Sequence, residues 1–191
     1  MEKEFWKPGN MVYPLPAVMV SCGIYGGKPR ERNILTVAWT GTVCTNPAMA
    51  YISVKPERHS YHIIKERGEY VINLTTEALA HATDYCGVRS GAKEDKFKAC
   101  HLTPGEARVV KAPLIVESPV NIECKVKDVL ELGSHHMFLS EVVGVDVDAF
   151  YMDEKGRFDL NRAGLMIYSH GEYYGLGEML GTFGYSVRKK K

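Results

Sequence analysis

Apolar residues along the chain fall mostly in short runs, which is the pattern of β-strands rather than of long helices. Residues 17–24 and 48–54 are two such runs, and residues 33–45 between them carry Thr, Val and Trp but no charge after Asn33. Turn signals separate these runs, with two glycines near residue 26 and an Asn-Pro pair at 46–47. We expect one strand in each run. Neighbouring strands without charge imply burial on both faces, or a ligand that covers one face.

Helical patterns are short and fall in the middle of the chain. Ser60 can cap a helix that stops at Gly68. After a strand at residues 70–74, residues 75–86 are predicted as a second helix and residues 93–99 as a short third helix.

The second half of the chain is again mainly β. Pro119 interrupts an apolar run at residues 114–127, residues 136–150 alternate between apolar and polar, and residues 165–175 are rich in aromatic residues and glycine. The sum is about seven strands with two or three helices inserted after the third and fourth. This order favours a closed or partly closed antiparallel β-barrel over a doubly wound parallel sheet, in which strands and helices alternate regularly. We therefore expect one mainly β domain over residues 1–191.

Basic and hydroxyl side chains gather where the third strand gives way to the first helix. Lys55, Arg58 and Ser60 lie within a few residues of a predicted helix N-terminus. Such a terminus presents unpaired N–H groups and a partial positive charge, and together with a guanidinium group it suits a phosphate monoester. Pro56 keeps the preceding residue extended, so the end of the strand stays open. The alternative is an exposed basic turn without a ligand.

Hydroxyl and amide groups also lie among the apolar residues just upstream, at residues 33–42. Inside apolar strands these groups need hydrogen-bond partners. A flat heteroaromatic ring with several C=O and N–H edges would supply them, with Trp39 as an apolar wall. A planar heterocycle at one end and a phosphate at the other describe flavin mononucleotide (FMN).

The order of short motifs over residues 33–73 resembles the flavin reductase-like group with the FMN-binding split-barrel fold, and within it the flavoredoxins. The shared pattern is Asn-x-x-Thr-x-x-Trp before an Asn-Pro turn, then a strand ending in Ser-Val, Arg-His-Ser at a helix start, and Gly-x-Tyr-Val-Ile-Asn. The resemblance extends, less tightly, over nearly the whole chain. It implies a mainly β, Greek-key-like split barrel with a few short inserted helices.

The resemblance also implies a role for individual residues. Asn33 and Trp39, with the backbone of residues 53–54, would hold the isoalloxazine ring, and Arg58 and Ser60 would bind the phosphate. Ser60 stands where relatives often carry Thr, which keeps the hydroxyl group.

Three further residues complete the expected site. Lys96 matches a lysine that reaches the cofactor, His135 matches a histidine near the flavin with His136 as the alternative, and Tyr168 matches an aromatic residue against the ring. The full expected set of FMN-binding residues is Asn33, Thr36, Ala38, Trp39, Thr40, Ser53, Val54, Arg58, Ser60, Lys96, His135 and Tyr168. Hydride transfer to a flavin needs no dedicated acid or base, so we expect no catalytic side chain.

The expected function is therefore that of an FMN-binding redox protein, in a homodimer with each flavin close to the interface. In one version reduced nicotinamide gives hydride to FMN, which reduces an acceptor. In a second version the protein is an electron carrier between protein partners and does not oxidise NAD(P)H. A barrel that binds another ligand, or only a partner protein, is the alternative from a different class.

Composition excludes several other classes of partner. Lys and Arg number 24 against 23 Asp and Glu, for a net charge of +1, which predicts neither nucleic-acid binding nor a membrane-surface field. No run of about 18 apolar residues occurs and the N-terminus is charged, so we expect neither a membrane span nor a secretion signal. Five cysteines without CxxC spacing favour the reducing cytoplasm. The basic C-terminus, residues 188–191, is expected to be a solvated tail.

Metal binding is not expected. Adjacent histidines at 135–136 would point to opposite faces of a strand, and His59 with His62 lacks an identifiable acidic or thiol partner. Cys86 and Cys100 fit no zinc spacing.

Overall fold

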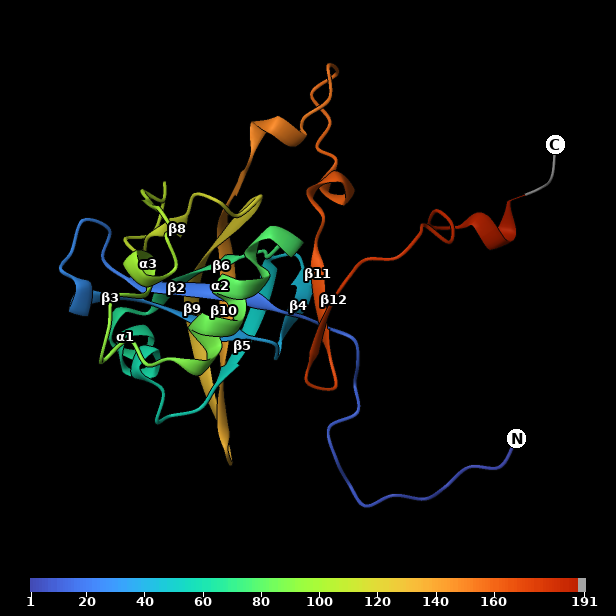
Figure 1. Cartoon of the computed structure of the whole chain (residues 1–191), viewed down its shortest axis with the longest axis horizontal. Coiled ribbons are helices and arrows are strands. Elements are labelled where there is room, and N and C mark those ends of the chain that lie inside the picture. The colour runs from blue at the N-terminus through green and yellow to red at the C-terminus, as the bar shows by residue number, and fades with distance from the viewer. Residues whose placement is uncertain (189–191) are drawn as a thin grey trace.

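A seven-stranded antiparallel sheet forms the body of the protein (Figure 1). The computed structural model describes residues 1–188, so residues 189–191 of the predicted basic tail lie outside the described part. The strand order is β3-β2-β6-β9-β10-β5-β4. The strands are β2 (Val18–Gly23), β3 (Arg32–Val37), β4 (Thr40–Thr45), β5 (Ala48–Val54), β6 (Glu69–Asn73), β9 (Val120–Leu132) and β10 (His135–Val147). The predicted mainly β, antiparallel fold class is confirmed.

The sheet curls into a split barrel because its two edge strands are consecutive in sequence. β3 and β4 lie at opposite edges of the strand order, yet only Ala38 and Trp39 separate them. The Trp39 carbonyl accepts a hydrogen bond from the Ser53 backbone N–H on β5, at 2.8 Å. The prediction of one strand over residues 33–45 was therefore wrong. The absence of charge shows burial, but it does not reveal where a chain leaves one sheet edge and joins the other.

Three α-helices lie against the β2–β3 side of the barrel: α1 (His59–Arg67), α2 (Ala80–Val88) and α3 (Lys96–Ala99). The C-terminal stop at Gly68 is as predicted, since Gly68 has φ 67° and donates to the Ile64 carbonyl at 2.8 Å. Ser60 is not the cap, however. Arg58 occupies that position without a side-chain capping bond, and the Ser60 hydroxyl accepts a hydrogen bond from Asn33 instead.

The remaining elements are short. β1 (Leu15–Pro16), β11 (Met166–Ser169) and β12 (Glu172–Gly175) form a three-stranded sheet, and β7 (Pro104–Gly105) pairs with β8 (Leu114–Ile115). 3-10 helices occur at Pro29–Glu31, Glu77–Leu79, Ala149–Tyr151, Leu160–Ala163 and Tyr185–Val187. The break predicted near Pro119 separates β8 from β9. In the described part of the chain, every helix is too short or too polar to span a bilayer.

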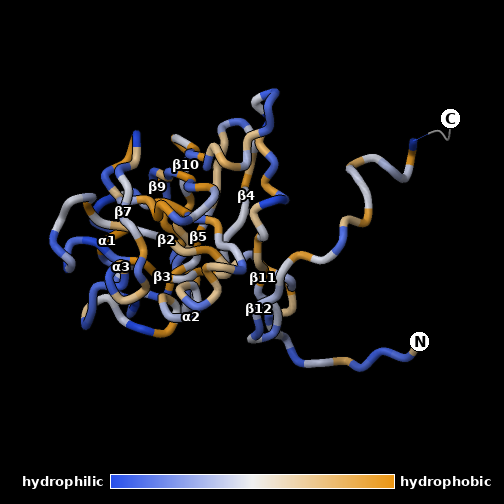
Figure 2. Tube along the Cα trace, turned by 45° about the horizontal axis from the view of Figure 1, so that its top comes forward, coloured by the Kyte–Doolittle hydropathy of each residue, from blue (hydrophilic) through white to orange (hydrophobic). Residues whose placement is uncertain are grey.

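β2 is buried on both faces, as its lack of charge indicated. Val18 and Val20 pack inside the barrel with Phe138, whereas Met19 packs on the opposite side against Leu79 of the segment before α2. Figure 2 shows hydrophobic positions concentrated along the central strands. Two apolar layers therefore hold β2 between the barrel interior and the helices.

A buried carboxylate fastens a loop to this sheet. Glu123 on β9 is 1% exposed and accepts hydrogen bonds from the backbone N–H groups of Arg108, Val109 and Val110 at 2.7–3.0 Å. These bonds hold the pKa of Glu123 below its usual value although burial opposes them. The loop thus packs on the outer face of the sheet, where Val110 and Ala112 cluster with Val71 of β6.

Candidate functional site

A cleft with two connected lobes opens where the barrel is split. The polar lobe, of about 290 Å³, is lined by Asn33, Arg58, Ser60, Arg89, Gly91 and Lys96 among others. The aromatic lobe, of about 350 Å³, is lined by Tyr13, Trp39, Ser53, His135, Tyr168 and Tyr173 among others. Leu35, Lys55 and Arg58 line both lobes, so the two form one cleft of the size of a small-molecule site.

The N-terminus of α1 forms one wall of the polar lobe. Arg58, the N-cap residue, donates a hydrogen bond from Nη1 to the Gly87 carbonyl at the end of α2, at 2.9 Å. The first N–H groups of a helix have no partner within the helix and carry a partial positive charge. Lys55 and Arg89 add further positive charge to the same lobe, and Glu57 is the one acidic residue that lines it. The lobe therefore favours an anion.

Asn33 and Ser60 form the floor of the polar lobe. Asn33 Nδ2 donates to Ser60 Oγ at 2.7 Å, which leaves the Ser60 hydroxyl hydrogen for another acceptor. Both side chains are buried, at 4% and 1% exposure. Gly91 packs directly over Asn33, since a Cβ at position 91 would lie 2.0 Å from Asn33 Oδ1. Only a glycine at this position leaves the floor undisturbed.

Lys96 brings a buried positive charge to the polar lobe. It is 3% exposed and donates to the backbone carbonyls of Ile34 and Cys86, each at 2.7 Å. No ion pair within 4.0 Å joins Lys96 to a carboxylate in the described residues, and burial lowers its pKa. A buried ammonium group without a counter-ion is costly. Its third N–H and its charge are available to an anionic ligand.

His59 supplies a second group without a partner. Its Nε2 atom is buried and makes no hydrogen bond with the described residues, although the side chain lines the polar lobe. Burial lowers the pKa of His59, and the nearby Lys96 lowers it further, so the imidazole is neutral near pH 7. An orphaned ring nitrogen, an uncompensated ammonium group and a free hydroxyl hydrogen together fit a phosphate group.

The aromatic lobe has flat walls. The Trp39 and His135 rings lie with their centroids 4.1 Å apart at 49°. Tyr168 and Tyr173, from the β11–β12 hairpin, have centroids 5.6 Å apart. The Tyr173 hydroxyl donates to Asp84 on α2 at 3.3 Å, which fastens the hairpin to the helix, and burial raises the pKa of Tyr173 to about 12. The lobe therefore suits a planar ring system.

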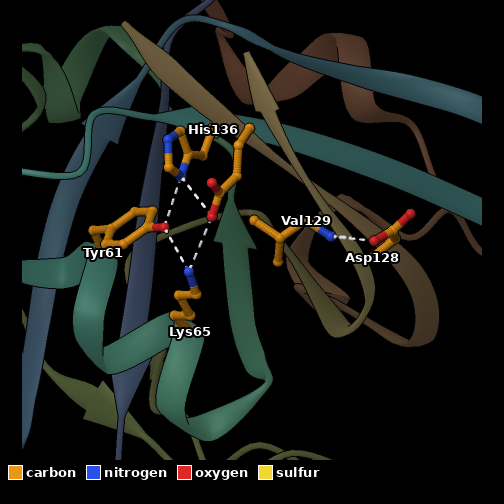
Figure 3. Close-up of polar contacts among 6 residues, drawn as sticks. Tyr61, Lys65, Asp128, Val129 and His136 are labelled. Carbon is orange, nitrogen blue, oxygen red and sulfur yellow. Dashed lines mark hydrogen bonds and ion pairs between the residues drawn. The ribbon is translucent and has the colours of Figure 1, made fainter. Parts of the chain in front are cut away.

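His135 and His136 point to opposite faces of β10. His135 lines the aromatic lobe, and burial and Lys55 lower its pKa, which keeps it neutral. His136 instead contacts Tyr61 of α1, whose hydroxyl lies 2.7 Å from His136 Nδ1, and Lys65 donates to the same hydroxyl at 3.3 Å (Figure 3). Of the two histidines, His135 is the one that lines the cleft.

The structure brings together eleven of the twelve expected residues. Thr36, Ala38 and Val54 line the aromatic lobe, and Asn33 lies in the polar lobe rather than at the ring end. Thr40 lines neither lobe, because it is buried on β4 and its hydroxyl donates to the Tyr51 carbonyl at 2.7 Å.

Sequence reasoning missed several lining residues, namely Tyr13, Arg89, Ser90, Gly91 and Tyr173. For the loop after α2 a signal was available, since two glycines bound a short segment that carries Arg89. Tyr13 and Tyr173 reach the cleft through the pairing of β1 with β11, which no local pattern reveals.

Known proteins match this chain over almost its whole length. The profile of the flavin reductase-like domain matches residues 11–177. The chain belongs to the flavin reductase-like family. An uncharacterised protein of Archaeoglobus fulgidus is 31% identical over 91% of this chain and 94% of its own length.

Solved structures of other proteins have the same fold as this chain. Flavoredoxin of Desulfovibrio vulgaris (Miyazaki F) has 30% identity and a TM-score of 0.87, covering 98% of this chain and 100% of its own. An FMN-binding protein of Thermus thermophilus has the same fold, with 19% identity and a TM-score of 0.78 over 95% of this chain and 99% of its own. Membership of this family supports a flavin-binding redox function.

The close packing of Gly91 on Asn33 yields a prediction. Gly91→Ala forces Asn33 from its position or strains the loop, and overpacking of this kind costs about 1–3 kcal/mol. We expect the melting temperature to fall by several degrees, at roughly 2–4 °C per kcal/mol for a chain of this length. Gly177→Ala is the matched control because a Cβ there meets no atom within 4 Å. Equal melting temperatures for the two variants would contradict the packing argument.

Proposed function

We propose that the protein binds FMN, with the phosphate in the polar lobe and the isoalloxazine ring in the aromatic lobe. The observation that carries this proposal is the buried, uncompensated charge of Lys96 beside the N-terminus of α1. A phosphate monoester dianion would supply the missing counter-charge, and the connected aromatic lobe gives the attached ring a place to lie. The name of the Thermus thermophilus relative supports FMN among the flavins.

In this proposal each side chain of the polar lobe has a distinct task. The Arg58 guanidinium group and the Ser60 hydroxyl donate hydrogen bonds to the phosphate. The buried ammonium group of Lys96 contributes positive charge. Charge-assisted hydrogen bonds of this kind are the strong ones in proteins. Glu57 limits the net positive charge at the rim.

The walls of the aromatic lobe orient the ring. Trp39 and His135 cover one side, and the neutral imidazole of His135 can donate or accept a hydrogen bond without adding charge. The backbone at Ser53 and Val54 offers further polar groups at the barrel mouth. When bound, FMN supplies reversible two-electron chemistry, and the protein supplies orientation and electrostatics.

We propose that electrons enter from reduced nicotinamide and leave to an acceptor, so that the protein is an oxidoreductase of the flavin reductase type. A second candidate is an electron carrier between protein partners. The resemblance to a flavoredoxin over the full length of both chains favours this carrier. The five cysteines, all present as free thiols, support a cytoplasmic location for either.

We also propose that the protein is a homodimer. Both terminal segments leave the body on the same side in Figure 1 and expose large apolar side chains, including Phe5, Trp6, Leu180 and Phe183. Exposed apolar residues in such number indicate a surface that is covered by another molecule. Sedimentation equilibrium should give twice the mass of one chain, and a monomer at micromolar concentration would contradict the proposal.

Removal of the Arg58 guanidinium group tests the phosphate site. Arg58→Ala should weaken FMN binding by about 1.5–3 kcal/mol, the range for hydrogen bonds to charged groups. Riboflavin, which lacks the phosphate, should lose far less. Arg67→Ala, at the opposite end of the same helix, is the control and should leave both affinities unchanged. Isothermal titration measures all of these affinities, and equal losses for FMN and riboflavin in Arg58→Ala would remove Arg58 from its role.

Stopped-flow absorbance separates the two candidate functions. If the protein oxidises nicotinamide, NADH or NADPH should bleach the absorbance of bound flavin within seconds of mixing. Absorbance that persists with both nucleotides, but is bleached by dithionite, would contradict the reductase and leave the carrier. A colourless protein that takes up no added FMN would contradict both and point to a barrel for another ligand.

A further inference from the structure

Two cysteines lie in contact beside the polar lobe, and the proposed function does not use them. Cys86 is on α2 and Cys100 is the C-cap residue of α3, and their sulfur atoms are 3.9 Å apart. Cys86 is 1% exposed and Cys100 is partly exposed. The other three cysteines stand apart from this pair, and Cys44 on β4 is partly exposed in the same way as Cys100.

The chain between these two cysteines forms one wall of the polar lobe. Arg89, Ser90, Gly91 and Lys96 all lie between them in sequence and all line the lobe. Both cysteines also bond to Lys96 through the backbone. The Cys86 carbonyl accepts from Lys96 Nζ at 2.7 Å, and the Cys100 N–H donates to the Lys96 carbonyl at 3.0 Å.

We propose that Cys86 and Cys100 are an oxidisable pair whose disulfide fastens the wall of the polar lobe. To form an S–S bond of about 2.05 Å, the two sulfur atoms must approach each other by about 1.9 Å. Rotation of the two side chains can supply this movement. Cys100, at the surface end of the pair, is the thiol that an oxidant reaches first. Because the consequence for the ligand concerns a phosphate in this lobe, it rests on the proposed function, whereas the disulfide itself does not.

The oxidant is a peroxide, and the reaction balances in two steps. The Cys100 sulfur, as its thiolate, attacks one peroxide oxygen, the O–O bond breaks, and a sulfenic acid and water form. The Cys86 sulfur then attacks the Cys100 sulfur and displaces a second water. Two thiols lose two electrons in all, and hydrogen peroxide is reduced to two molecules of water.

The surroundings of the pair set how this reaction depends on pH. Burial raises the pKa of Cys86 to about 12 and also raises the pKa of Cys100, although the positive charge of Lys96 opposes the shift at both. The nearby negative charge of Glu94 also raises the pKa values of both cysteines. Both thiols are therefore neutral near pH 7. Since the thiolate is the reactive form, oxidation should accelerate steadily as the pH rises from 7 to 9.

The disulfide should have two measurable consequences. It closes a loop of about 15 residues, for which the chain-entropy account predicts a stabilisation equivalent to a rise in melting temperature of roughly 5–10 °C. It also restricts the wall that carries Arg89 and Lys96, so a bound flavin nucleotide should dissociate more slowly, by about threefold or more.

The test treats the purified full-length protein with hydrogen peroxide and maps its disulfides by mass spectrometry under alkylating conditions. We expect one Cys86–Cys100 cross-link, reversed by dithiothreitol, together with the rise in melting temperature. Cys100→Ser should abolish the cross-link and the rise in melting temperature. Cys44→Ser, which removes a thiol on β4, should preserve both effects. Should Cys100→Ser fail to fold, blocking Cys100 in the native protein with iodoacetamide serves the same purpose.

Dissociation of FMN from oxidised and reduced protein is measured in parallel. A sulfinic acid at Cys100, or a cross-link from Cys100 to any cysteine other than Cys86, would overturn the proposal that Cys86 and Cys100 are an oxidisable pair. A correct cross-link with unchanged FMN dissociation would overturn the effect on the wall. A correct cross-link in a protein that binds no FMN would refute the proposed function and leave the dithiol site standing.

Discussion

The structure depends on one topological constraint: the two edge strands of a seven-stranded sheet are joined by two residues. β3 and β4 lie at opposite ends of the strand order, and Ala38 with Trp39 is the whole connection between them. A flat sheet would place those edges many strand spacings apart, so the sheet must curl until they nearly meet. The incomplete closure leaves the split, and Trp39 is fixed at its mouth by the hydrogen bond between its carbonyl and Ser53.

The split determines where polar groups can gather. The end of β5 leads into the N-terminus of α1, and Lys96, the first residue of α3, lines the same lobe. Lys96 is buried between α3, β3 and the end of α2, so the cost of its charge is carried by the packed core around it, and in the proposed function a bound phosphate would relieve that cost. Burial and nearby positive charges lower the pKa values of both His59 and His135, which favours their neutral forms. Charge is thus concentrated at one end of the cleft, and flat apolar surface at the other.

The sequence predicted those parts of the fold that leave a local signal. The absence of charge in β2, the Gly68 stop and the Pro119 break all act within a few residues, and each is present in the structure. The break at Ala38–Trp39 left no such signal, because it arises from pairing between distant strands. Ser60 shows the same limit. Serine is a residue type that suits a helix cap, but the Ser60 hydroxyl instead accepts a hydrogen bond from the buried side-chain amide of Asn33, 27 residues away.

The candidate site was largely recognisable because its chemistry needs unusual residues in apolar surroundings. Asn33, Arg58 and Ser60 stand out by residue type, whereas Lys96 was predicted from the family resemblance alone, and all four meet in one lobe. Thr40 lies outside both lobes because β4 turns its hydroxyl toward the Tyr51 carbonyl. The β11–β12 hairpin contributes Tyr173 through a tertiary contact with Asp84, which sequence spacing cannot encode.

A crystal structure of the protein grown with FMN tests the central claim most directly. The account predicts the phosphate within hydrogen-bond distance of Arg58 and Ser60 at the N-terminus of α1, and the ring beside Trp39 and His135. Density for the phosphate at any other surface, with the polar lobe still holding only solvent, would contradict it.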